Sequence, residues 1–158
     1  MKSFKKIVLE LIKRGETIST MESCTGGLVA NSITNCSGSS LVFKFGAVTY
    51  SNEYKIKMGV DGNLIDAYTV YSKEVAHDMS KKISDFTFSN YSIGITGKLN
   101  KTDINNFSDF DNVVYFCIYD RDNDLYYEYD LVVNSYERSI AKKEVLDVIL
   151  EKLLQIVK

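Results

Sequence analysis

The sequence predicts a three-layer α/β/α sandwich built around a mixed β-sheet. Helical and strand segments alternate in the order αβαβααβββα, the pattern of an α/β domain with helices on both faces of its sheet. A strand joined to the next by a helix makes a right-handed crossover, so the N-terminal strands should pair in parallel. A β-hairpin between residues 113 and 133 adds antiparallel strands, which makes the sheet mixed.

Length and composition are those of one ordinary globular domain. We expect a single domain over residues 1–158, long enough to bury roughly 70% of the surface that the unfolded chain exposes. No apolar run reaches the roughly 20 residues of a membrane-spanning helix, and a net charge of −2 argues against broad nucleic-acid binding. We therefore expect a cytoplasmic protein that binds neither nucleic acid nor a membrane, and a small anionic ligand stays open as a candidate partner. Whether it forms a homo-oligomer stays open.

The cysteines carry no sign of a structural role in cross-linking. Cys24, Cys36 and Cys117 are odd in number and lack the spacing of metal ligands. Reduced thiols of this kind are typical of the cytoplasm. We expect no disulfide, no metal and no cofactor.

The N-terminal third should contain a helix, a strand and a second helix. The apolar pattern in residues 1–15 is interrupted by Glu10, which favours an amphipathic helix over a signal sequence. Ile18-Ser19-Thr20 alternates like a short strand. The apolar spacing that follows predicts a packed helix from about Thr25 to Asn35, with a loop over residues 36–40.

The middle of the chain should hold two strands and two helices. Phe45 to Tyr50 predicts a strand, and Ser51-Asn52-Glu53 caps a short helix that contains Lys55 and ends at Gly59. Ser72 is expected to cap a helix that extends to Phe86. Tyr91 to Thr96 is apolar enough for a buried strand that Gly97 ends.

The C-terminal part should close the fold with a hairpin and a long helix. A polar loop from Lys98 to Asp111 precedes two strands, Val113 to Tyr119 and Leu125 to Val133. Ser135 to Val157 predicts a helix with an apolar inner stripe. The stripe comprises Ile140, Val145, Leu146, Ile149, Leu150, Leu153 and Leu154.

The turn from Met21 to Gly27 is the most informative place to look for chemistry. It lies where an expected strand becomes a helix, and ligands of α/β sheets collect beyond the carboxyl ends of the strands. The N–H groups around Thr25, Gly26 and Gly27 would offer a helix N-terminus to an anion or an oxyanion. The turn is therefore expected to hold either a substrate anion or a reacting carbonyl oxygen.

Ser23, Tyr50 and Lys55 fall at equivalent places after neighbouring strands, so their side chains are expected to converge. A serine hydroxyl needs a base, and the single histidine, His77, lies in the middle of a helix. A lysine can replace it if burial lowers its pKa from about 10.4 by up to roughly 3 to 5 units. Tyr50 would relay a proton or stack on a substrate ring.

Each of these residues also has an ordinary structural explanation. Ser23 can be a helix N-cap, Lys55 a solvated lysine and Tyr50 a strand aromatic. Cys24 is expected to pack as a small buried residue, since nothing near it in the sequence lowers its pKa. The spacing by itself leaves the enzyme and structural interpretations about equal.

Three groups of residues together resemble the CinA C-terminal domain family. They are Thr20-Met21-Glu22-Ser23-Cys24-Thr25-Gly26-Gly27-Leu28, Ser37-Gly38-Ser39-Ser40, and Gly46 to Lys55 followed by Gly59-Val60. The resemblance implies an α/β/α sandwich and a nicotinamide-nucleotide amidase, which hydrolyses nicotinamide mononucleotide to nicotinate mononucleotide and ammonia. It implies Ser23 as the nucleophile, Lys55 as the base and Tyr50 as a further catalytic residue.

The resemblance also supplies candidate substrate-binding residues. Arg138 stands at the first arginine of the family's Gly-Asp-Arg-x-x-x-Arg segment and would hold a phosphate or carboxylate, while Lys142 stands at the second. The full candidate set is Glu22, Thr25, Gly26, Gly27, Thr96, Gly97 and Arg138. Full-length family members carry a further domain ahead of this one, to which no residues here correspond, so we expect a stand-alone domain.

The chain departs from the family's third motif. Where the family has Ala-Gly-Pro and a glycine-rich loop, this chain has Thr96-Gly97-Lys98-Leu99-Asn100 and an Asn/Asp-rich segment up to Asn112. The glycines would allow close approach to a ligand, so their absence bears on turnover. A rival hypothesis is therefore a nucleotide-binding or scaffold protein that has lost turnover. A third is a serine-lysine hydrolase of other amides or esters.

Overall fold

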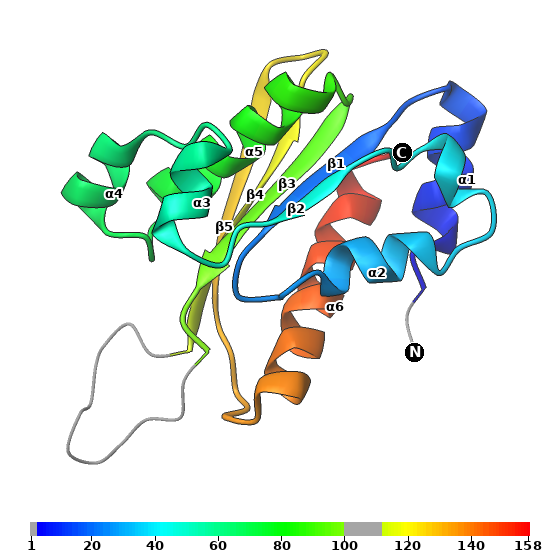
Figure 1. The fold of residues 1–158 in the computed structure, drawn as a ribbon. Helices are drawn as coiled ribbons and strands as arrows, with labels where there is room; N and C mark the ends of the chain where they lie inside the picture. Colours follow the sequence, from blue (N-terminus) through cyan, green and yellow to red (C-terminus); the bar gives the residue numbers. More distant parts are fainter. Residues whose placement is uncertain (1–2, 100–111) are drawn as a thin grey trace.

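A five-stranded mixed sheet organises the protein, with helices on both of its faces (Figure 1). The computed structural model describes residues 3–99 and 112–158. The strands are β1 (Ile18–Glu22), β2 (Gly46–Val48), β3 (Tyr91–Gly97), β4 (Val113–Asp120) and β5 (Leu125–Val132). They lie in the order β2-β1-β3-β4-β5. The predicted three-layer sandwich with a mixed sheet is confirmed.

Strand direction follows from the connections, as predicted. β1 pairs in parallel with both β2 and β3, whereas β3–β4 and β4–β5 are antiparallel. The register places Glu22, the last residue of β1, beside Val48 and Ile95. Three parallel strands thus end at the same edge of the sheet, and the segments that follow them lie close together.

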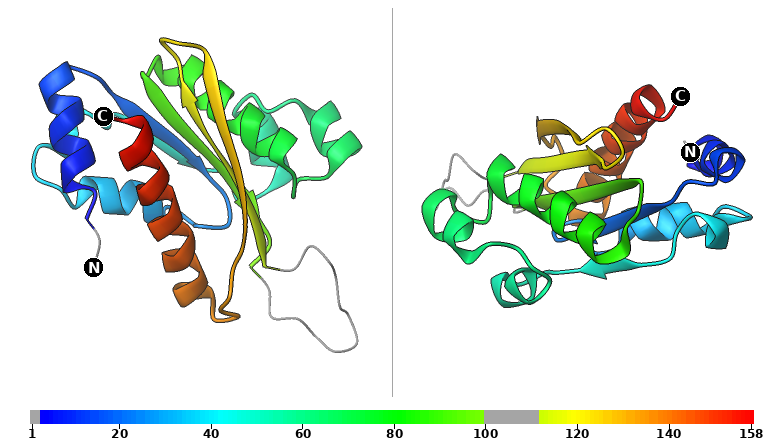
Figure 2. Two further views of the ribbon diagram at one scale, coloured as in Figure 1. Left: turned by 180° about the vertical axis from the view of Figure 1, so that it is seen from behind. Right: turned by 90° about the horizontal axis from the view of Figure 1, so that it is seen from above.

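Seven helical segments, six α-helices and one 3₁₀ helix, cover the sheet in the described part of the chain. They are α1 (Lys5–Arg14), α2 (Leu28–Thr34), η1 (Ser39–Leu41), α3 (Asn52–Lys57), α4 (Gly62–Tyr68), α5 (Lys73–Thr87) and α6 (Arg138–Ile156). Figure 2 shows α1, α2 and α6 on one face of the sheet and α5, with α3 and α4 beside it, on the other. None of these helices is long and apolar enough to cross a membrane.

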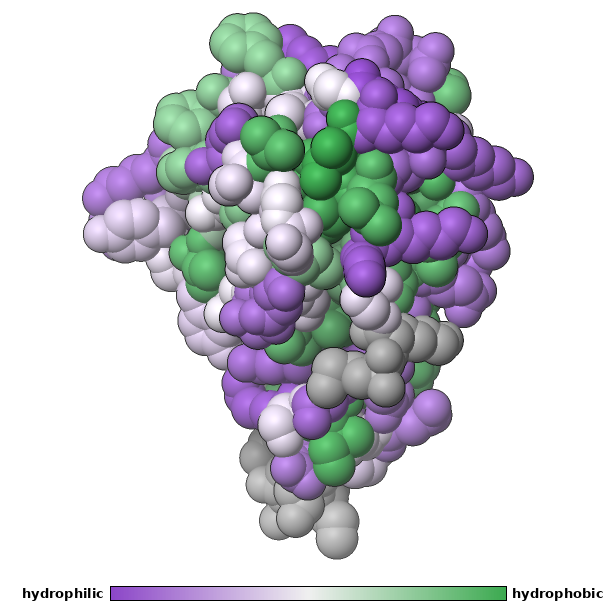
Figure 3. All heavy atoms as spheres, turned by 90° about the vertical axis from the view of Figure 1, so that its right-hand side faces the viewer, coloured by the Kyte–Doolittle hydropathy of each residue, from purple (hydrophilic) through white to green (hydrophobic). Residues whose placement is uncertain are grey.

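Two apolar clusters hold the layers together. The larger contains buried residues of α1, α2 and α6 and of one face of the sheet, among them Leu11, Ile93 and Ile149. The smaller lies on the other face and includes Met21, Val75 and Met79. The end of the molecule at the right of Figure 1 presents mostly hydrophilic side chains around a smaller hydrophobic area (Figure 3). The main apolar surfaces therefore lie between the layers.

Local signals account for most helix ends. Ser51 and Ser72 accept N–H bonds from Tyr54 and Val75 and so cap α3 and α5, as predicted. Gly59 follows α3 with a φ of 106°, a conformation that glycine adopts without strain. Ser23 is not an N-cap, because α2 begins five residues later and Gly27 precedes it without a side-chain cap.

Three details differ from the sequence prediction. Helix α4 was not predicted, because its seven residues include none that is fully buried and give too short a periodic signal. Strand β2 pairs over Gly46–Val48 only, a shorter segment than 45–50. Ile140 is 46% exposed, because the neighbouring Ala141 occupies the inward position on α6. The predicted loop from Lys98 to Asp111 lies mostly outside the described residues.

Gly94 allows α5 to lie directly on β3. A Cβ at this position would meet the Ala76 carbonyl oxygen and would lie 2.5 Å from the Ser80 nitrogen. Both are backbone atoms of α5, so the helix would have to move away from the sheet. The helix could not relieve the contact by rotating a side chain.

We expect Gly94→Ala to lower the free energy of unfolding by about 3 kcal/mol or more, because overpacking here displaces a whole helix. Urea unfolding measures the loss. Gly62→Ala is the control, since its Cβ would make only ordinary contacts with the Ile56 side chain at 3.4 and 3.9 Å. Equal free energies of unfolding of Gly94→Ala and Gly62→Ala would show that the packing of α5 on β3 does not require the absence of a side chain at residue 94.

Candidate active site

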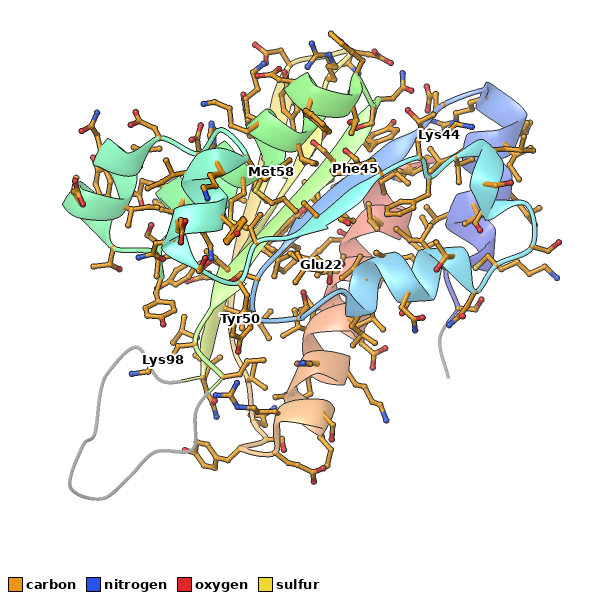
Figure 4. The ribbon with its side chains drawn as sticks, viewed as in Figure 1. Glu22, Lys44, Phe45, Tyr50, Met58 and Lys98 are labelled. Carbon is orange, nitrogen blue, oxygen red and sulfur yellow. The ribbon has the colours of Figure 1, made fainter. Side chains whose placement is uncertain are left out.

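A pocket of about 130 Å³ lies beyond the ends of the parallel strands. It is bounded by the turn after β1, the segment from Tyr50 into α3, the end of β3 and the start of α6, where Tyr50 and Lys98 are labelled in Figure 4. The lining residues are Ser23, Cys24, Tyr50, Asn52, Lys55, Val70, Tyr71, Gly97, Lys98, Leu99 and Arg138. The structure therefore brings Ser23, Tyr50 and Lys55 to one pocket.

Ser23 and Lys55 form a buried hydrogen-bonded pair. Lys55 Nζ lies 2.9 Å from Ser23 Oγ and donates to the Thr49 carbonyl oxygen at 2.7 Å. Only 1% of Lys55 and 7% of Ser23 is exposed. The position of Lys55 follows from α3, whose Ser51 cap starts the helix so that this residue faces inward. A nucleophile and a base within hydrogen-bonding distance are the minimum arrangement for covalent catalysis.

The surroundings of Lys55 favour its neutral form. No carboxylate forms an ion pair with it in the described part of the chain, and both of its hydrogen-bond partners are uncharged. Burial lowers the pKa of Lys55 to about 8, with a weak opposing effect from Cys24. About a tenth of the protein then carries a neutral amine at pH 7. Lys55 is thus suited to accept a proton from Ser23.

Cys24 does not compete as a nucleophile although it lines the pocket. It is 6% exposed. Burial raises the pKa of its thiol to about 12, and the charge of Glu22 adds to this effect. The thiol stays protonated at neutral pH, and only the thiolate is a strong nucleophile. Cys24 packs as a small buried residue, as the sequence predicts.

His77 lies away from the pocket. Its Nδ1 contacts Glu128 of β5, and its ring stacks on Tyr126 with 3.7 Å between ring centroids. These contacts fix it on the outer side of α5 and β5. The only histidine in the sequence is therefore not the base for Ser23.

Tyr50 lies at the rim of the pocket and is 61% exposed. Its hydroxyl oxygen accepts a hydrogen bond from Arg138 Nη1 at 3.1 Å. The structure thus joins Tyr50 to the predicted anion-binding arginine and shows no bond from Tyr50 to Ser23 or Lys55. A direct proton relay through Tyr50 is not visible in this arrangement.

The glycine turn differs from the prediction in one of its donors. Gly26 and Gly27 adopt φ angles of 62° and 98°, which suit glycine. The Gly26 N–H donates to the Ser23 carbonyl at 3.0 Å. It closes the turn and is not available to an oxyanion, in contrast to the prediction. Behind the turn, Lys142 Nζ would lie 3.2 Å from a Cβ at Gly26.

The predicted anion site at the start of α2 is already filled from within the chain. The Glu22 carboxylate accepts from the Val29 and Ala30 N–H groups, each at 3.0 Å, and from Thr25 Oγ1 at 2.7 Å. Glu22, labelled in Figure 4, and Thr25 are both buried, and neither is among the residues that line the pocket. The N–H groups of Val29 and Ala30 are therefore not available to an external anion, because an internal carboxylate occupies them.

Thr96 and Gly97, two further predicted substrate-binding residues, differ in whether they line the pocket. Thr96 is 1% exposed and its hydroxyl donates to the Val70 carbonyl at 2.8 Å, so it supports the pocket wall from behind. Gly97 does line the pocket. A Cβ there would lie 2.7 Å from the Val113 carbonyl oxygen, which shows that close pairing with β4 requires glycine.

Several lining residues escaped the sequence analysis. Asn52, Tyr71, Lys98 and Leu99 come from segments whose meeting depends on the fold. Lys98 and Arg138, with Lys55, give the described lining three cationic residues and no carboxylate. In the sequence, Lys98 directly follows Gly97, and Asn52 lies three residues before Lys55. This short separation from predicted site residues was the only sequence signal that Asn52 and Lys98 would line the pocket. The charge of the lining suits an anionic ligand.

Comparison with known proteins places these observations in a family. The model of the CinA C-terminal domain matches residues 2–157. The solved structure of the competence/damage inducible protein CihA from Agrobacterium tumefaciens has a TM-score of 0.89 and 26% identity, over 97% of this chain and 92% of that one. A competence or damage-inducible protein from Enterobacter asburiae has a TM-score of 0.88 at 21% identity, over 98% and 95%. The second likeness concerns the fold alone.

Curated relatives match a shorter segment. A CinA-like protein of Chloroherpeton thalassium is 49% identical over 90 residues, which are 56% of this chain and 21% of that protein. A Clostridium botulinum relative whose name refers to competence and damage induction is 48% identical over 88 residues, 55% of this chain. The matched segment spans about a fifth of the length of these relatives.

We expect the stability of the protein to depend on the charge of Lys55. The pKa of this residue is about 8 in the folded protein and about 10.4 in the unfolded chain. Between these values the unfolded state binds more protons, so the free energy of unfolding rises with pH. Relative to Lys55→Met, the wild type should gain roughly 2–3 kcal/mol between about pH 7 and about pH 10, measured by urea unfolding.

Lys57→Met is the matched control, because Lys57 belongs to the same helix but its side chain is 58% exposed. Its difference from the wild type should stay nearly constant over that pH range. If the difference in free energy of unfolding between the wild type and Lys55→Met were equally constant over this pH range, the Lys55 amine would have an ordinary pKa in the folded protein.

Proposed function

The chain belongs to the CinA C-terminal domain family, and on that premise we propose that it is an amidohydrolase. Its substrate in this proposal is nicotinamide mononucleotide, which it converts to nicotinate mononucleotide and ammonia. The observation that carries the proposal is the Lys55 amine, buried without a carboxylate in the described part of the chain and 2.9 Å from Ser23 Oγ. Burial of a lysine in this manner is costly and is characteristic of a general base.

The geometry supports a two-step reaction. Neutral Lys55 takes the proton of Ser23 as Ser23 Oγ attacks the carboxamide carbon, which forms a tetrahedral intermediate. The protonated Lys55 then returns this proton to the leaving amine, the C–N bond breaks, and ammonia departs. A water molecule attacks the resulting ester, again with Lys55 as the base, and releases the carboxylate product and Ser23.

The developing oxyanion needs donors at the Ser23 turn. With the Gly26 N–H directed to Ser23, the candidate within the described pocket lining is the N–H group of Cys24, which donates to no backbone carbonyl of the described residues, whereas Thr25 and Gly27 do not line the pocket. Fixed backbone donors of this kind stabilise a negative oxygen without reorganising during the reaction. In this proposal the Cys24 N–H acts on the carbonyl oxygen of the substrate.

The remaining charges favour a nucleotide with its phosphate toward the rim. Arg138 and Lys98 are cations of the pocket lining, and α2 offers no competing anion site because Glu22 occupies its N–H groups. An arginine guanidinium matches the geometry of a phosphate. Tyr71 and Tyr50 supply aromatic surface for a pyridine ring.

One rival follows from the departure after Gly97. The sequence from Lys98 to Asn112 lacks the glycines of the family's substrate loop, so in this rival function the protein binds the nucleotide without turning it over. Calorimetry distinguishes the two functions, since binding of nicotinamide mononucleotide without ammonia release supports the rival. If nicotinamide mononucleotide neither binds nor releases ammonia but a fluorophosphonate labels Ser23, the protein would be a hydrolase of another amide or ester.

Purified protein should release ammonia from nicotinamide mononucleotide, and Ser23→Ala should lower kcat by at least about a thousandfold, because the nucleophile is removed. A coupled ammonia assay measures the rate. Cys24→Ala is the neighbouring control and should retain most activity, since its thiol is protonated. Turnover that survives in Ser23→Ala would contradict the proposed mechanism.

The rate should follow the titration of Lys55. Its neutral form is the base, and the pKa is about 8, so kcat should rise tenfold per pH unit below that value and level off above it. Lys55→Arg, whose side chain stays charged, should be inactive at every pH tested. A rate independent of pH between about 6 and about 9 would exclude Lys55 as the base.

A further inference from the structure

Glu22 is a buried carboxylate whose charge is balanced by donors of its own chain. Its side chain is fully buried and forms no ion pair with a described residue. One oxygen accepts from Thr25 Oγ1 and the Val29 N–H, and the other accepts from the Ala30 N–H. It is therefore neither a pocket residue nor a member of the Ser23–Lys55 pair.

The carboxylate reaches across the turn that holds Ser23. Helix caps ordinarily come from the residue that precedes the helix, but Gly27 precedes α2 and has no side chain. Glu22 is the last residue of β1, immediately before Ser23, and its carboxylate binds the first turn of α2. It thus joins the strand to the helix on either side of the nucleophile.

The same residue is connected to the base through its backbone. The Thr49 N–H donates to the Glu22 carbonyl at 2.8 Å, and the Thr49 carbonyl in turn accepts from Lys55 Nζ at 2.7 Å. On the other side, the Ser23 N–H donates to the Ile95 carbonyl at 3.0 Å. The backbone holds the strand side of the turn, whereas the Glu22 carboxylate holds its helix side.

We propose that Glu22 is a positioning residue, which fixes the Ser23 hydroxyl against Lys55 by binding Thr25 and the first turn of α2. The proposal rests on the proposed function of Ser23 as the nucleophile. The Glu22 carboxylate supplies three hydrogen bonds to the helix side of the turn, where Gly27 gives α2 no side-chain cap. A displaced Ser23 would react slowly even in a folded protein.

Glu22→Gln tests the proposal, because glutamine keeps the shape but offers one acceptor oxygen and points an NH₂ group at one of the two backbone donors. We expect kcat for nicotinamide mononucleotide to fall roughly 30- to 100-fold. KM should change less than about threefold, and the pH midpoint should stay near that of the wild type, since neither Lys55 nor the rim is altered. Amide hydrogen exchange should become faster at Val29 and Ala30.

Asp78→Asn is the matched control. Asp78 is also a buried carboxylate and accepts the Asp61 N–H at 2.8 Å. Unlike Glu22 it also pairs with Lys82 Nζ at 2.9 Å, and it does not line the pocket. It should lower the melting temperature to a similar degree while kcat stays within about twofold of the wild type. Equal losses of kcat in the two variants would reduce Glu22 to a general contributor to stability and overturn the proposal.

Thr25 provides a second test if Glu22→Gln does not fold. Thr25→Ser keeps the hydroxyl that binds Glu22, and Thr25→Val removes it with little change in volume. We expect Thr25→Ser to retain most of kcat and Thr25→Val to lose about tenfold. Equal rates in both variants would contradict the proposed role of the Glu22 contacts.

The outcomes separate this inference from the proposed function. If the wild type releases no ammonia, the amidase proposal fails, and exchange at Val29 and Ala30 still reports whether Glu22 or Thr25 holds the turn. Unchanged exchange in Glu22→Gln and in Thr25→Val would overturn the positioning role. Faster exchange at Val29 and Ala30 in Glu22→Gln, together with a loss of kcat that Asp78→Asn does not show, would support both the positioning role and the proposed function.

Discussion

Burying the Lys55 amine next to Ser23, with no carboxylate partner among the described residues, is the constraint on which the site depends. An amine in this position is held by the Thr49 carbonyl and the Ser23 hydroxyl, both uncharged, and its pKa falls to about 8 because burial disfavours the charged form. A carboxylate partner would stabilise the ammonium and remove the base. The energetic cost of this burial is offset by the packing of the rest of the domain.

The distribution of charge around the pocket is consistent with that constraint. Glu22 is close in sequence to Ser23, yet its carboxylate binds the N–H groups of α2 and the Thr25 hydroxyl. Arg138 and Lys98 contribute cations to the lining. The negative charge of Glu22 is therefore satisfied within the turn, and the described pocket lining contains cationic side chains and no carboxylate.

Periodicity and turn residues were sufficient to predict most of the fold. The Ser51 and Ser72 caps, the turn at Gly59 and the hairpin of β4 and β5 were all predicted, because each signal is contained in a few neighbouring residues. Helix α4 was not predicted, because none of its seven residues is buried and so short a segment carries almost no periodic signal. The predicted stripe of α6 began one residue too early at Ile140, whereas Ala141 shares the four-residue spacing of Val145 and Ile149 and is the inward side chain.

The sequence by itself determined the class of fold and the residues Ser23, Tyr50 and Lys55 as candidates for chemistry. Only the tertiary structure decided their geometry: the burial of Lys55, the bond from Arg138 to Tyr50, and the use of Glu22 within the turn. The physical reason is the separation in sequence over which each kind of interaction acts. Caps and periodicity act between residues a few positions apart, whereas the partners of Ser23 and Tyr50 lie 32 and 88 residues away and meet them only once the sheet has formed and α6 packs against it.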